Sequence, residues 1–466
     1  MRKISIEEIT KNTEGRILRG TPGAEVSGVS TDTREIVRGD AFFALTGKRH
    51  DAHDFLGDAV AAGSTALIVE RGETVPVDYD GAIILVSDTL AAYQNLASWY
   101  RQTVGPAVIA VTGSVGKTTL KDMIATAASA RYRTLATEKN YNNHVGVPKT
   151  IFRMSGDTEL LVLEMGMNHA GEIRLLTEIA RPDAAVITNI GVSHRENFDS
   201  DNGILHAKLE VASLFGIENA LFVNGDDTAL RSHAERDDLP YDVVTAGESE
   251  GCDYRITHPE YTGEAEIGFG LQYGREATVQ FRIPAAGRYV GVSAALAVAV
   301  LSRFGISSSE VAERLKEFER TGHRLNLMVS GGLRIIDDTY NASPDSMRSA
   351  IDYLSSFGGY RKIAVLAGMN ELGEDSETLH YGVGEYAAST GVDILAAVGE
   401  KAATIADGFS AGSQGKSSVE KCVDNDDAIS ALLSIVKEGD VVLVKGSRAY
   451  GTEGIVSALV AGREAS

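Results

Sequence analysis

The chain has 466 residues, which is too long for a single hydrophobic core and predicts about three domains. Its apolar content of 43% and charged content of 23% are ordinary for a soluble globular protein. A formal net charge of −21 argues against a nucleic-acid partner, because such partners bind through basic surfaces. A local basic cluster can still bind an anionic substrate.

The two cysteines, Cys252 and Cys422, lie far apart in a spacing that suits no metal site. We therefore expect a reducing compartment and no disulfide framework. The N-terminus lacks the apolar core of a signal peptide, and no uninterrupted apolar run reaches membrane-spanning length. These features predict a cytoplasmic protein without membrane insertion.

The first predicted domain, residues 1–104, alternates short apolar runs with alanine-rich helical stretches. Runs at 66–69 and 82–86 predict strands, so this is a small α/β domain. Its densest polar cluster spans 30–34 and is followed by a loop that ends at Gly47. Hydroxyls beside an arginine suit a phosphate or diphosphate, and an Asp–Arg pair within a turn is the alternative.

The stretch 108–119 carries the strongest functional signal. Residues 108–111 predict a buried strand, a loop of small residues follows, and a helical pattern begins at Thr119. Glycines let backbone N–H groups turn toward an anion, and the helix N-terminus adds a partial positive charge. Lys117 would reach the β- and γ-phosphates of a nucleotide, and the Thr118 hydroxyl would bind Mg²⁺.

This loop is a shorter version of the usual phosphate-loop pattern, because Val111 stands in place of the first glycine. A chance glycine turn between a strand and a helix is the alternative. The strand, the loop, the lysine and the hydroxyl nevertheless fall in the expected order. The predicted nucleotide-binding residues of the loop are Thr112, Gly113, Ser114, Val115, Gly116, Lys117, Thr118 and Thr119.

Two further strands carry polar residues at their ends. The strand 160–165 contains Glu164, and the loop after the strand 184–189 carries His194. Since ligands gather at the carboxyl ends of strands in open parallel sheets, we expect both side chains to face the same site as Lys117. Glu164 suits a Mg²⁺ ligand. The alternatives are a helix cap for Glu164 and a surface position for His194.

The predicted central domain covers 105–322. Its helix after His194 carries Lys208, whose spacing indicates nothing beyond a solvated lysine. Residues 253–283 lose the helical period and predict strands, whereas 290–303 predicts an alanine-rich buried helix.

The third predicted domain, 323–466, follows a hinge at 321–324 and repeats the alternation of strands and helices. It is therefore a second open α/β sheet, and its polar strand-end loops suggest a lid over the nucleotide. The strands are predicted at 333–337, 363–367, 393–398 and 441–445, and the loops at 337–344 and 445–448.

In order and over essentially the whole chain, these landmarks resemble the Mur ligases, the ATP-dependent amide ligases of peptidoglycan precursor synthesis. The paired asparagines, the Tyr-Asn-Ala-x-Pro motif and the Lys-Gly-Ser-Arg motif are the most specific features, and the Asp-Asn-Pro-Arg motif of the diaminopimelate-adding relatives is absent. The supporting segments are 31–34, Gly47 with Asp51, His53 and Phe55, 112–119, 140–148, 164–173, 188–191 with His194, 338–347, 371–373 and 445–448.

The resemblance implies an α/β protein of three domains: a small N-terminal α/β domain, a central P-loop α/β sheet domain and a C-terminal Rossmann-like ligase domain. It implies an enzyme, acting as a monomer, that adds D-alanyl-D-alanine to UDP-N-acetylmuramoyl-tripeptide through an acyl phosphate and releases ADP. One alternative is another ligase of this superfamily with a different carboxylate and amine. A second alternative is a nucleotide-binding regulator or scaffold that performs no ligation.

By the same resemblance, ATP occupies the phosphate loop, while Thr118 and Glu164 hold one Mg²⁺. His194 and Lys208 help to hold a second Mg²⁺, with Lys208 carbamylated. A carbamate would turn this cation into a carboxylate-like oxygen ligand, which Mg²⁺ prefers. The implied catalytic residues are Lys117, His194, Lys208 and Arg324, the last of which approaches the γ-phosphate.

The remaining roles are also implied by the resemblance alone. Tyr340 and Asn341 match a loop near the nucleoside. The segment 31–34 and Gly47 match the region that holds the uridine diphosphate. The residues implied to bind substrate are Thr31, Asp32, Thr33, Arg34, Gly47, Asn142, Asn143, Lys445, Ser447 and Arg448.

Several residues depart from the pattern of the family, mostly on the adenine and ribose side rather than at the γ-phosphate. They are His323 and Ala52 in place of glycines, Ser343 in place of an asparagine, Gly368 in place of an aspartate, and Tyr289, Val290 and Ser293 in place of a His-Asn-x-x-Asn set.

Overall fold

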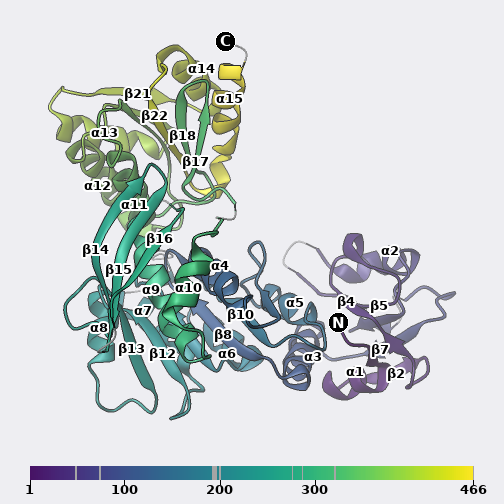
Figure 1. The fold of residues 1–466 in the computed structure, drawn as a ribbon. Helices are drawn as coiled ribbons and strands as arrows, with labels where there is room; N and C mark the ends of the chain where they lie inside the picture. The colour runs from purple at the N-terminus through teal and green to yellow at the C-terminus, as the bar shows by residue number, and fades with distance from the viewer. Residues whose placement is uncertain are drawn as a thin grey trace. The chain divides into compact units, whose positions relative to one another are not determined.

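The computed structural model describes residues 1–47, 50–72, 75–191, 197–198, 201–274, 277–285, 287–319 and 322–464 (Figure 1). The chain divides into two compact units. Unit 1 comprises Met1–Thr112, Ala128–Ala185 and Leu209–Ala220, and unit 2 comprises Gly113–Ala127, Val186–Lys208 and Leu221–Ser466. Within the described ranges, no helix combines the length and the apolar character that a membrane span requires.

The N-terminal part of unit 1 is built on a five-stranded sheet in the order β2-β7-β6-β5-β4. Its strands are β2 (Arg16–Arg19), β4 (Gly28–Ser30), β5 (Asp40–Phe43), β6 (Ala66–Val69) and β7 (Ala82–Leu85), and only the β2–β7 pair among them is antiparallel. β5 and β6 are buried along their whole length, as expected for parallel strands covered on both faces.

A two-stranded antiparallel sheet and several helices complete this part of unit 1. Asp32 and Asp51 each begin a short 3₁₀ helix by accepting a hydrogen bond from a backbone N–H two residues on. These elements are β1 (Ile4–Ser5), β3 (Glu25–Val26), α1 (Ile6–Asn12), η1 (Thr33–Glu35), η2 (Ala52–Phe55), α2 (Leu56–Ala61) and α3 (Thr89–Val104).

The central sheet has nine strands in the order β16-β15-β14-β13-β12-β11-β8-β10-β9. β8 and β9 pair with β10 in parallel, whereas β14, β15 and β16 form an antiparallel end. The strands are β8 (Ala107–Thr112), β9 (Thr134–Ala136), β10 (Leu160–Glu164), β11 (Ala184–Ile187), β12 (Ala220–Asn224), β13 (Asp242–Gly247), β14 (Tyr254–Gly263), β15 (Glu266–Tyr273) and β16 (Val279–Ile283).

The buried helix predicted at 290–303 is confirmed as α9 (Tyr289–Ser302). The predicted start of another helix is wrong. The helix after the phosphate loop begins at Lys117 and not at Thr119, so Lys117 and Thr118 belong to its first turn. The helices are α4 (Lys117–Ala128), α5 (Gly146–Phe152), α6 (Glu172–Ala180), α7 (Asp201–Leu209), η5 (Glu210–Ala212), α8 (Thr228–Ala234), α9 (Tyr289–Ser302) and α10 (Ser308–Leu315).

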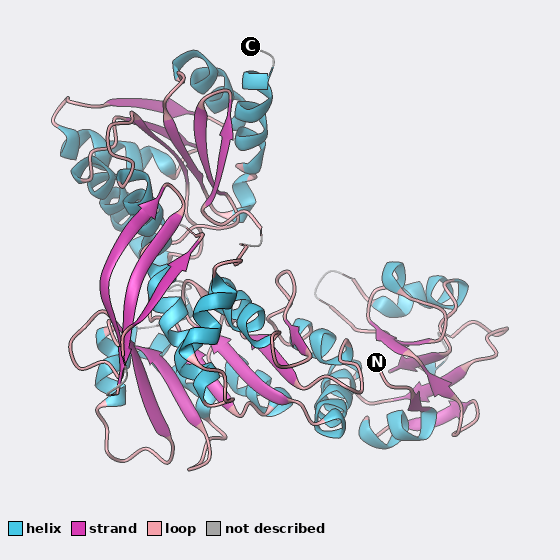
Figure 2. Cartoon of the chain, viewed as in Figure 1, coloured by secondary structure: helices cyan, strands magenta, loops and turns pink. Residues whose placement is uncertain are grey.

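The C-terminal sheet of unit 2 has six strands in the order β17-β18-β22-β19-β20-β21, of which only the β17–β18 pair is antiparallel. Helices lie on both of its faces (Figure 2). The strands are β17 (Asn326–Ser330), β18 (Leu333–Asp338), β19 (Lys362–Ala367), β20 (Ile394–Val398), β21 (Ser418–Cys422) and β22 (Val441–Lys445).

The two faces of this sheet bury separate apolar cores. On β18, Leu333 and Ile335 belong to the core with α14 and α15, and Ile336 belongs to the core with α11, α12 and α13. This alternation follows from the period of two along a strand. The helices are α11 (Pro344–Ser355), η6 (Gly373–Asp375), α12 (Ser376–Ser389), α13 (Ala402–Ser413), α14 (Asn425–Ile435), η7 (Arg448–Tyr450) and α15 (Glu453–Glu464).

The predicted α/β class is confirmed. Each of the three predicted ranges contains one of the large sheets: the five-stranded sheet in 1–104, the nine-stranded sheet in 105–322 and the six-stranded sheet in 323–466. The domain boundaries themselves stay predictions, because the compact units divide the chain differently.

Candidate active site

The phosphate loop runs from the end of β8 to the first turn of α4, as predicted. Gly113 and Gly116 have φ values of +143° and +85°, which glycine adopts without strain. A Cβ at Gly113 would lie 1.9 Å from the Thr188 hydroxyl oxygen, so only glycine fits beside the end of β11. A glycine loop at the N-terminus of a twelve-residue helix suits the phosphates of a nucleotide.

The carboxamide of Asn189, just beyond β11, fixes the shape of this loop. Its Oδ1 accepts hydrogen bonds from the backbone N–H groups of Ser114 at 3.0 Å and of Val115 at 2.9 Å. The Thr188 hydroxyl also donates to the carbonyl oxygen of Val115 at 2.6 Å. The sequence analysis assigns no separate role to Asn189, although its position at the end of a predicted strand is a signal for one.

The two lysines predicted to act at the phosphates lie within electrostatic range of each other in unit 2. Lys117 Nζ donates to the carbonyl oxygens of Gly113 at 2.7 Å and Ser114 at 3.2 Å. Lys208, at the end of α7, is only 3% exposed. Burial, and then the charge of Lys117, hold the pKa of Lys208 well below its usual value. The interpretation of Lys208 as a solvated lysine is therefore wrong.

Glu164 ends β10 in unit 1, and its side chain is held in place. The strand register pairs it with Val111, near the end of β8 that leads into the phosphate loop. The residue is 3% exposed, its backbone N–H donates to the Thr137 hydroxyl at 3.0 Å, and its Oε1 accepts from Asn142 Nδ2 at 2.8 Å. The helix-cap alternative is wrong, because the N-cap of the next helix, α6, is Gly171. A fixed carboxylate fits the hard ligand set of Mg²⁺.

The second predicted asparagine, Asn143, shapes the turn that leads into α5. Its Oδ1 accepts from the backbone N–H groups of Val145 at 3.2 Å and Gly146 at 2.9 Å. A Cβ at Gly146 would lie 2.4 Å from the backbone of Tyr141, so the turn requires glycine there. Both asparagines thus have local partners, and their predicted contact with the muramoyl peptide stays a prediction.

Two sequence predictions concern residues outside the described ranges. His194, the predicted partner of Lys208 at a metal, lies in the undescribed segment 192–196. Thr321, the first residue of the predicted hinge, lies outside as well, whereas Gly322, His323 and Arg324 are described.

In the N-terminal cluster, Asp32 and Arg34 form a bidentate ion pair. Arg34 Nε and Nη2 donate to the two carboxylate oxygens at 2.9 and 2.6 Å. This hydrogen bonding lowers the pKa of Asp32 to about 2. The Arg34 side chain is 86% exposed, and Thr31 and Thr33 are half-buried. The pair proposed as the alternative therefore exists, and diphosphate binding by this cluster stays a prediction.

Two other residues near this cluster have local contacts. Lys149 of α5 forms an ion pair with Glu35, and its ammonium lies 4.5 Å from the centre of the Tyr141 ring. Gly47 is exposed, and its N–H donates to the carbonyl oxygen of His50 at 2.9 Å. The predicted role of Gly47 at the uridine diphosphate is not tested by these contacts.

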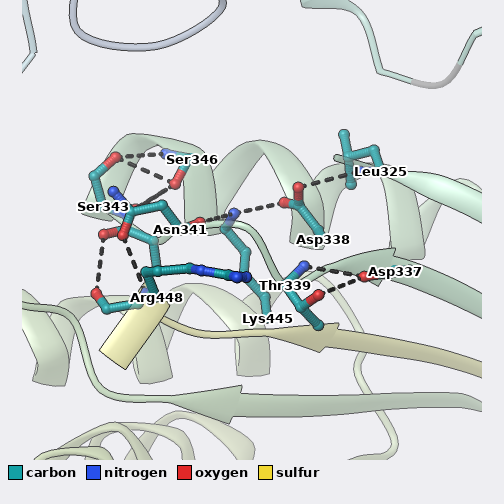
Figure 3. Close-up of polar contacts among 11 residues, drawn as sticks. Leu325, Asp337, Asp338, Thr339, Asn341, Ser343, Ser346, Lys445 and Arg448 are labelled. Carbon is teal, nitrogen blue, oxygen red and sulfur yellow. Dashed lines mark hydrogen bonds and ion pairs between the residues drawn. The ribbon is translucent and has the colours of Figure 1, made fainter. Parts of the chain in front are cut away.

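In the C-terminal sheet, Arg324 stacks on Tyr340, with the guanidinium carbon 4.0 Å from the ring centre. Leu325, next along the chain, has a φ of +47°, a conformation that costs a bulky residue about 1–3 kcal/mol. Its N–H donates to Asp338 Oδ1 at 3.1 Å, as Figure 3 shows. The hydrogen bond from Leu325 to Asp338 fixes the backbone next to Arg324, and the contact with Tyr340 holds the Arg324 guanidinium.

The Lys-Gly-Ser-Arg loop is attached to the loop that contains Tyr340. The Lys445 ammonium is 2% exposed and contacts Asp338 Oδ2 at 2.5 Å and the Asn341 carbonyl oxygen at 2.9 Å (Figure 3). The Ser447 hydroxyl accepts from Asn370 N–H at 3.0 Å. Arg448 is mostly exposed, and its N–H donates to Asn341 Oδ1 at 3.4 Å. Substrate binding by Lys445, Ser447 and Arg448 stays a prediction.

The departures from the family pattern have local structural partners. Val290 and Ser293 are buried in α9. His323 Nδ1 lies 2.6 Å from Asp337 Oδ2. Ser343 is the N-cap of α11 in a capping box with Ser346.

Three departures remain. At Gly368, an added Cβ would lie 2.3 Å from the Tyr450 hydroxyl, so this tyrosine occupies the place of the aspartate side chain. Tyr289 begins α9 and packs against the apolar core under α11–α13, and Ala52 begins η2.

Comparison with known proteins places these features in a family. Residues 111–301 match the Mur ligase middle domain, and residues 323–448 match the glutamate ligase domain of the Mur ligases. The chain is 39% identical, over 437 residues that cover 93% of each chain, to the UDP-N-acetylmuramoyl-tripeptide–D-alanyl-D-alanine ligase of Bacillus subtilis (strain 168).

Solved structures agree with this assignment. A crystal structure of MurF from Acinetobacter baumannii matches with a TM-score of 0.88 at 30% identity and covers 99% of both chains. A MurF ligase from Thermotoga maritima in complex with ADP matches with a TM-score of 0.84 at 29% identity, covering 94% of this chain and 98% of that one. Motifs, fold and full-length similarity thus lead to the same conclusion: the chain belongs to the Mur ligase family.

Proposed function

We propose that the protein is an ATP-dependent amide ligase that joins D-alanyl-D-alanine to UDP-N-acetylmuramoyl-tripeptide and forms ADP and phosphate. The observation that carries this proposal is the full-length similarity to ligases of that name, together with the phosphate loop at 112–119. The ADP bound to the related Thermotoga maritima enzyme supports the choice of nucleotide.

The reaction proceeds in two steps. A carboxylate oxygen of the tripeptide attacks the γ-phosphorus of ATP, and the bond to the β-phosphate oxygen breaks to give an acyl phosphate and ADP. The amine of D-alanyl-D-alanine then attacks the acyl carbon, loses a proton and displaces inorganic phosphate. Such phosphoryl transfer depends mainly on positioning and on neutralising charge.

Positioning of the phosphates and neutralisation of their charge are assigned to separate side chains. Lys117 contacts the β- and γ-phosphates, and Arg324 approaches the γ-phosphate. Thr118 and Glu164 would hold one Mg²⁺, and His194 with carbamylated Lys208 would help to hold a second. Bound Mg²⁺ would supply positive charge that neutralises the phosphates.

Burial of Lys208 supports the carbamate, because a neutral amine is the form that reacts with carbon dioxide. Burial, and then the charge of Lys117, hold the pKa of this amine well below its usual value and so favour the neutral form. A carbamate would supply the oxygen ligand that Mg²⁺ prefers.

The substrates are placed by the family motifs. The uridine diphosphate lies at 31–34 and Gly47, the muramoyl peptide at Asn142 and Asn143, and the nucleoside near Tyr340 and Asn341. Ser447, which is buried, and Arg448, which is exposed, are the residues of the Lys-Gly-Ser-Arg loop assigned to substrate binding. We further propose that the enzyme acts as a monomer in the cytoplasm.

Release of ADP tests the proposal. The purified protein is assayed with ATP, Mg²⁺ and UDP-N-acetylmuramoyl-tripeptide, with and without D-alanyl-D-alanine, and the ligated product is identified by mass. We expect ADP release to depend on the dipeptide. Release that depends on a different amine would identify another ligase of this superfamily, and nucleotide binding without release would identify a non-catalytic relative.

A matched pair of variants assigns the activity to the phosphate loop. Lys117→Ala is expected to lower kcat by roughly 10²–10³-fold, because a contact made in the transition state is lost. Lys316→Ala removes an exposed lysine that pairs with Glu313 and should leave kcat unchanged. Wild-type turnover by Lys117→Ala would refute the role of the loop.

A further inference from the structure

The buried ion pair between Lys445 and Asp338 links two motifs that are far apart in the sequence. β18 and β22 are neighbouring parallel strands, and their register pairs Asp338 with Lys445 at the carboxyl ends of both. The side chain is 2% exposed, and its ammonium donates hydrogen bonds to Asp338 Oδ2 and the Asn341 carbonyl oxygen. Two of the three donors of Lys445 are therefore used inside the domain.

The same carboxylate holds the segment that carries Arg324. Asp338 uses its second oxygen, Oδ1, to accept a hydrogen bond from Leu325 N–H at 3.1 Å, so one side chain bridges Lys445 and Leu325 (Figure 3). Leu325 is 4% exposed and has a φ of +47°, a conformation that the surrounding contacts must maintain.

The residue before Arg324 is fixed in an equivalent way. The His323 ring lies 2.6 Å from Asp337, and the His323 carbonyl oxygen accepts from Tyr340 N–H at 3.1 Å. The other oxygen of Asp337 accepts from the Thr339 hydroxyl at 2.7 Å. Arg324 thus lies between two residues held by consecutive carboxylates at the end of β18, and its guanidinium stacks on Tyr340.

We infer that Lys445 is a positioning residue of the ligase reaction: through Asp338 and Leu325, it sets the backbone from which Arg324 approaches the γ-phosphate. The chain of contacts is Lys445 to Asp338, Asp338 to Leu325, and Leu325 to its neighbour Arg324. The inference rests on the proposed function, and in particular on the role of Arg324. It replaces substrate binding as the role of Lys445.

A double-mutant cycle in the ADP-release assay tests the inference. Lys445→Met, which keeps the length of the side chain without its charge, should lower kcat roughly 10- to 100-fold, since small displacements of a catalytic group have effects of this size. The KM values for the dipeptide and the UDP-tripeptide should change by less than about 2-fold, because no substrate contact is lost. In an Arg324→Ala background, Lys445→Met should change kcat by less than about 3-fold, because the side chain through which Lys445 acts has already been removed.

The control is Lys421→Met, which removes a lysine that pairs with Asp407 at 2.8 Å on the surface of the same domain. It should leave kcat and both KM values unchanged. Lys445→Met leaves Asp338 as an unpaired buried charge, which can prevent folding. In that case the double variant Lys445→Met/Asp338→Asn, which removes both charges, is measured in the wild-type and Arg324→Ala backgrounds instead.

The outcomes separate the inference from the proposed function. A wild-type protein without dipeptide-dependent ADP release would overturn the function, and full activity of Arg324→Ala would overturn the role of that arginine. With both intact, an equal loss of kcat from Lys445→Met in the two backgrounds would show a merely structural effect and overturn the inference. A raised KM for the dipeptide with kcat preserved would return Lys445 to substrate binding.

Discussion

At the scale of single residues, Lys117 and Lys208 are both predicted to act at the site, but the sequence pattern indicates a role only for Lys117. The sequence assigns Lys117 to a phosphate site because its neighbours form a pattern with a known mechanism, and the structure places it in the first turn of the helix after the glycine loop. Lys208 has no such pattern, and its position in α7 indicates neither burial nor exposure. Its burial depends on packing around the helix, which the spacing of residues along one helix does not determine.

Chemical rescue tests the carbamate on Lys208. Lys208→Ala should be inactive, because the oxygen ligand is lost, and short carboxylic acids should restore part of the activity by supplying a replacement carboxylate. The measurement is ADP release as a function of acid concentration. Lys316→Ala, at an exposed lysine, should be active and insensitive to the acid. An active Lys208→Ala enzyme that does not respond to bicarbonate would rule the carbamate out.

Asn142 provides a second test at this scale. Its amide holds Glu164 Oε1 at 2.8 Å, and loss of such a partner typically weakens metal binding or activity roughly 10- to 100-fold. We therefore expect Asn142→Ala to raise the Mg²⁺ concentration needed for half-maximal activity by a factor in this range. Asn219→Ala, which removes an exposed amide bonded to the Asp183 carbonyl oxygen, is the control.

The competing outcome for Asn142 is equally specific. An unchanged Mg²⁺ requirement together with a raised KM for the UDP-tripeptide would mean that Asn142 contacts the substrate, as the family motif implies. The sequence could not separate these roles, because a paired-asparagine motif does not reveal which amide faces the strand end and which shapes the turn.

At the scale of elements, continuous apolar runs predicted the strands well. β6, β18, β19 and β22 lie where their runs of Val, Ile, Leu and Ala indicate, because parallel strands buried on both faces need such runs. The start of α4 was placed two residues late, at Thr119, since glycine loops and first helical turns share small polar residues. A boundary of this kind is set by the loop contacts to Asn189, which come from a distant segment.

The departure at Ser343 is explained at this scale and gives a stability prediction. Serine and asparagine are both good N-caps, so the exchange preserves the start of α11. Ser343→Asn should therefore keep the unfolding free energy within about 0.5 kcal/mol, and Ser343→Ala should lower it by about 1 kcal/mol.

Chemical denaturation measures the difference, with Ser434→Ala as the control. Ser434 lies inside α14 and donates only to a carbonyl oxygen of its own helix, so its loss should have little effect. A stable Ser343→Ala protein, or an unstable Ser343→Asn protein, would contradict the capping explanation.

At the scale of the whole molecule, the net charge of −21 contrasts with the charge of the candidate site. Nucleotide and substrate are anions, yet Lys117 and Lys208 lie within electrostatic range of each other in unit 2, and Arg324 is predicted to approach the γ-phosphate. The average charge argues against a nucleic-acid partner but leaves an anionic substrate open, because a local cluster can bind it. The strand-end rule predicted that Glu164 and His194 face the same site as Lys117. The burial of Lys208 within electrostatic range of Lys117 could not be predicted from spacing along one helix.

Binding of ADP should stabilise only part of this chain. A 466-residue protein with three large sheets is not expected to unfold in a single two-state step. ADP with Mg²⁺ at about 100 times its dissociation constant adds about 2.7 kcal/mol, which should raise the transition of unit 2, the unit that contains the phosphate loop from Gly113 onward and Tyr340, by roughly 5–10 °C. Calorimetry with wild type and Lys117→Ala checks this, since the variant should lose most of the shift. A uniform shift of every transition would contradict it.

The contact between Asn189 and the phosphate loop has a consequence for nucleotide capture. Because one carboxamide oxygen binds two successive N–H groups, the loop acquires its curvature when the sheet forms and does not have to acquire it around each incoming nucleotide. The entropy loss of ordering the loop is then part of folding, and association loses correspondingly less. The phosphate loop therefore has its curvature before ATP binds.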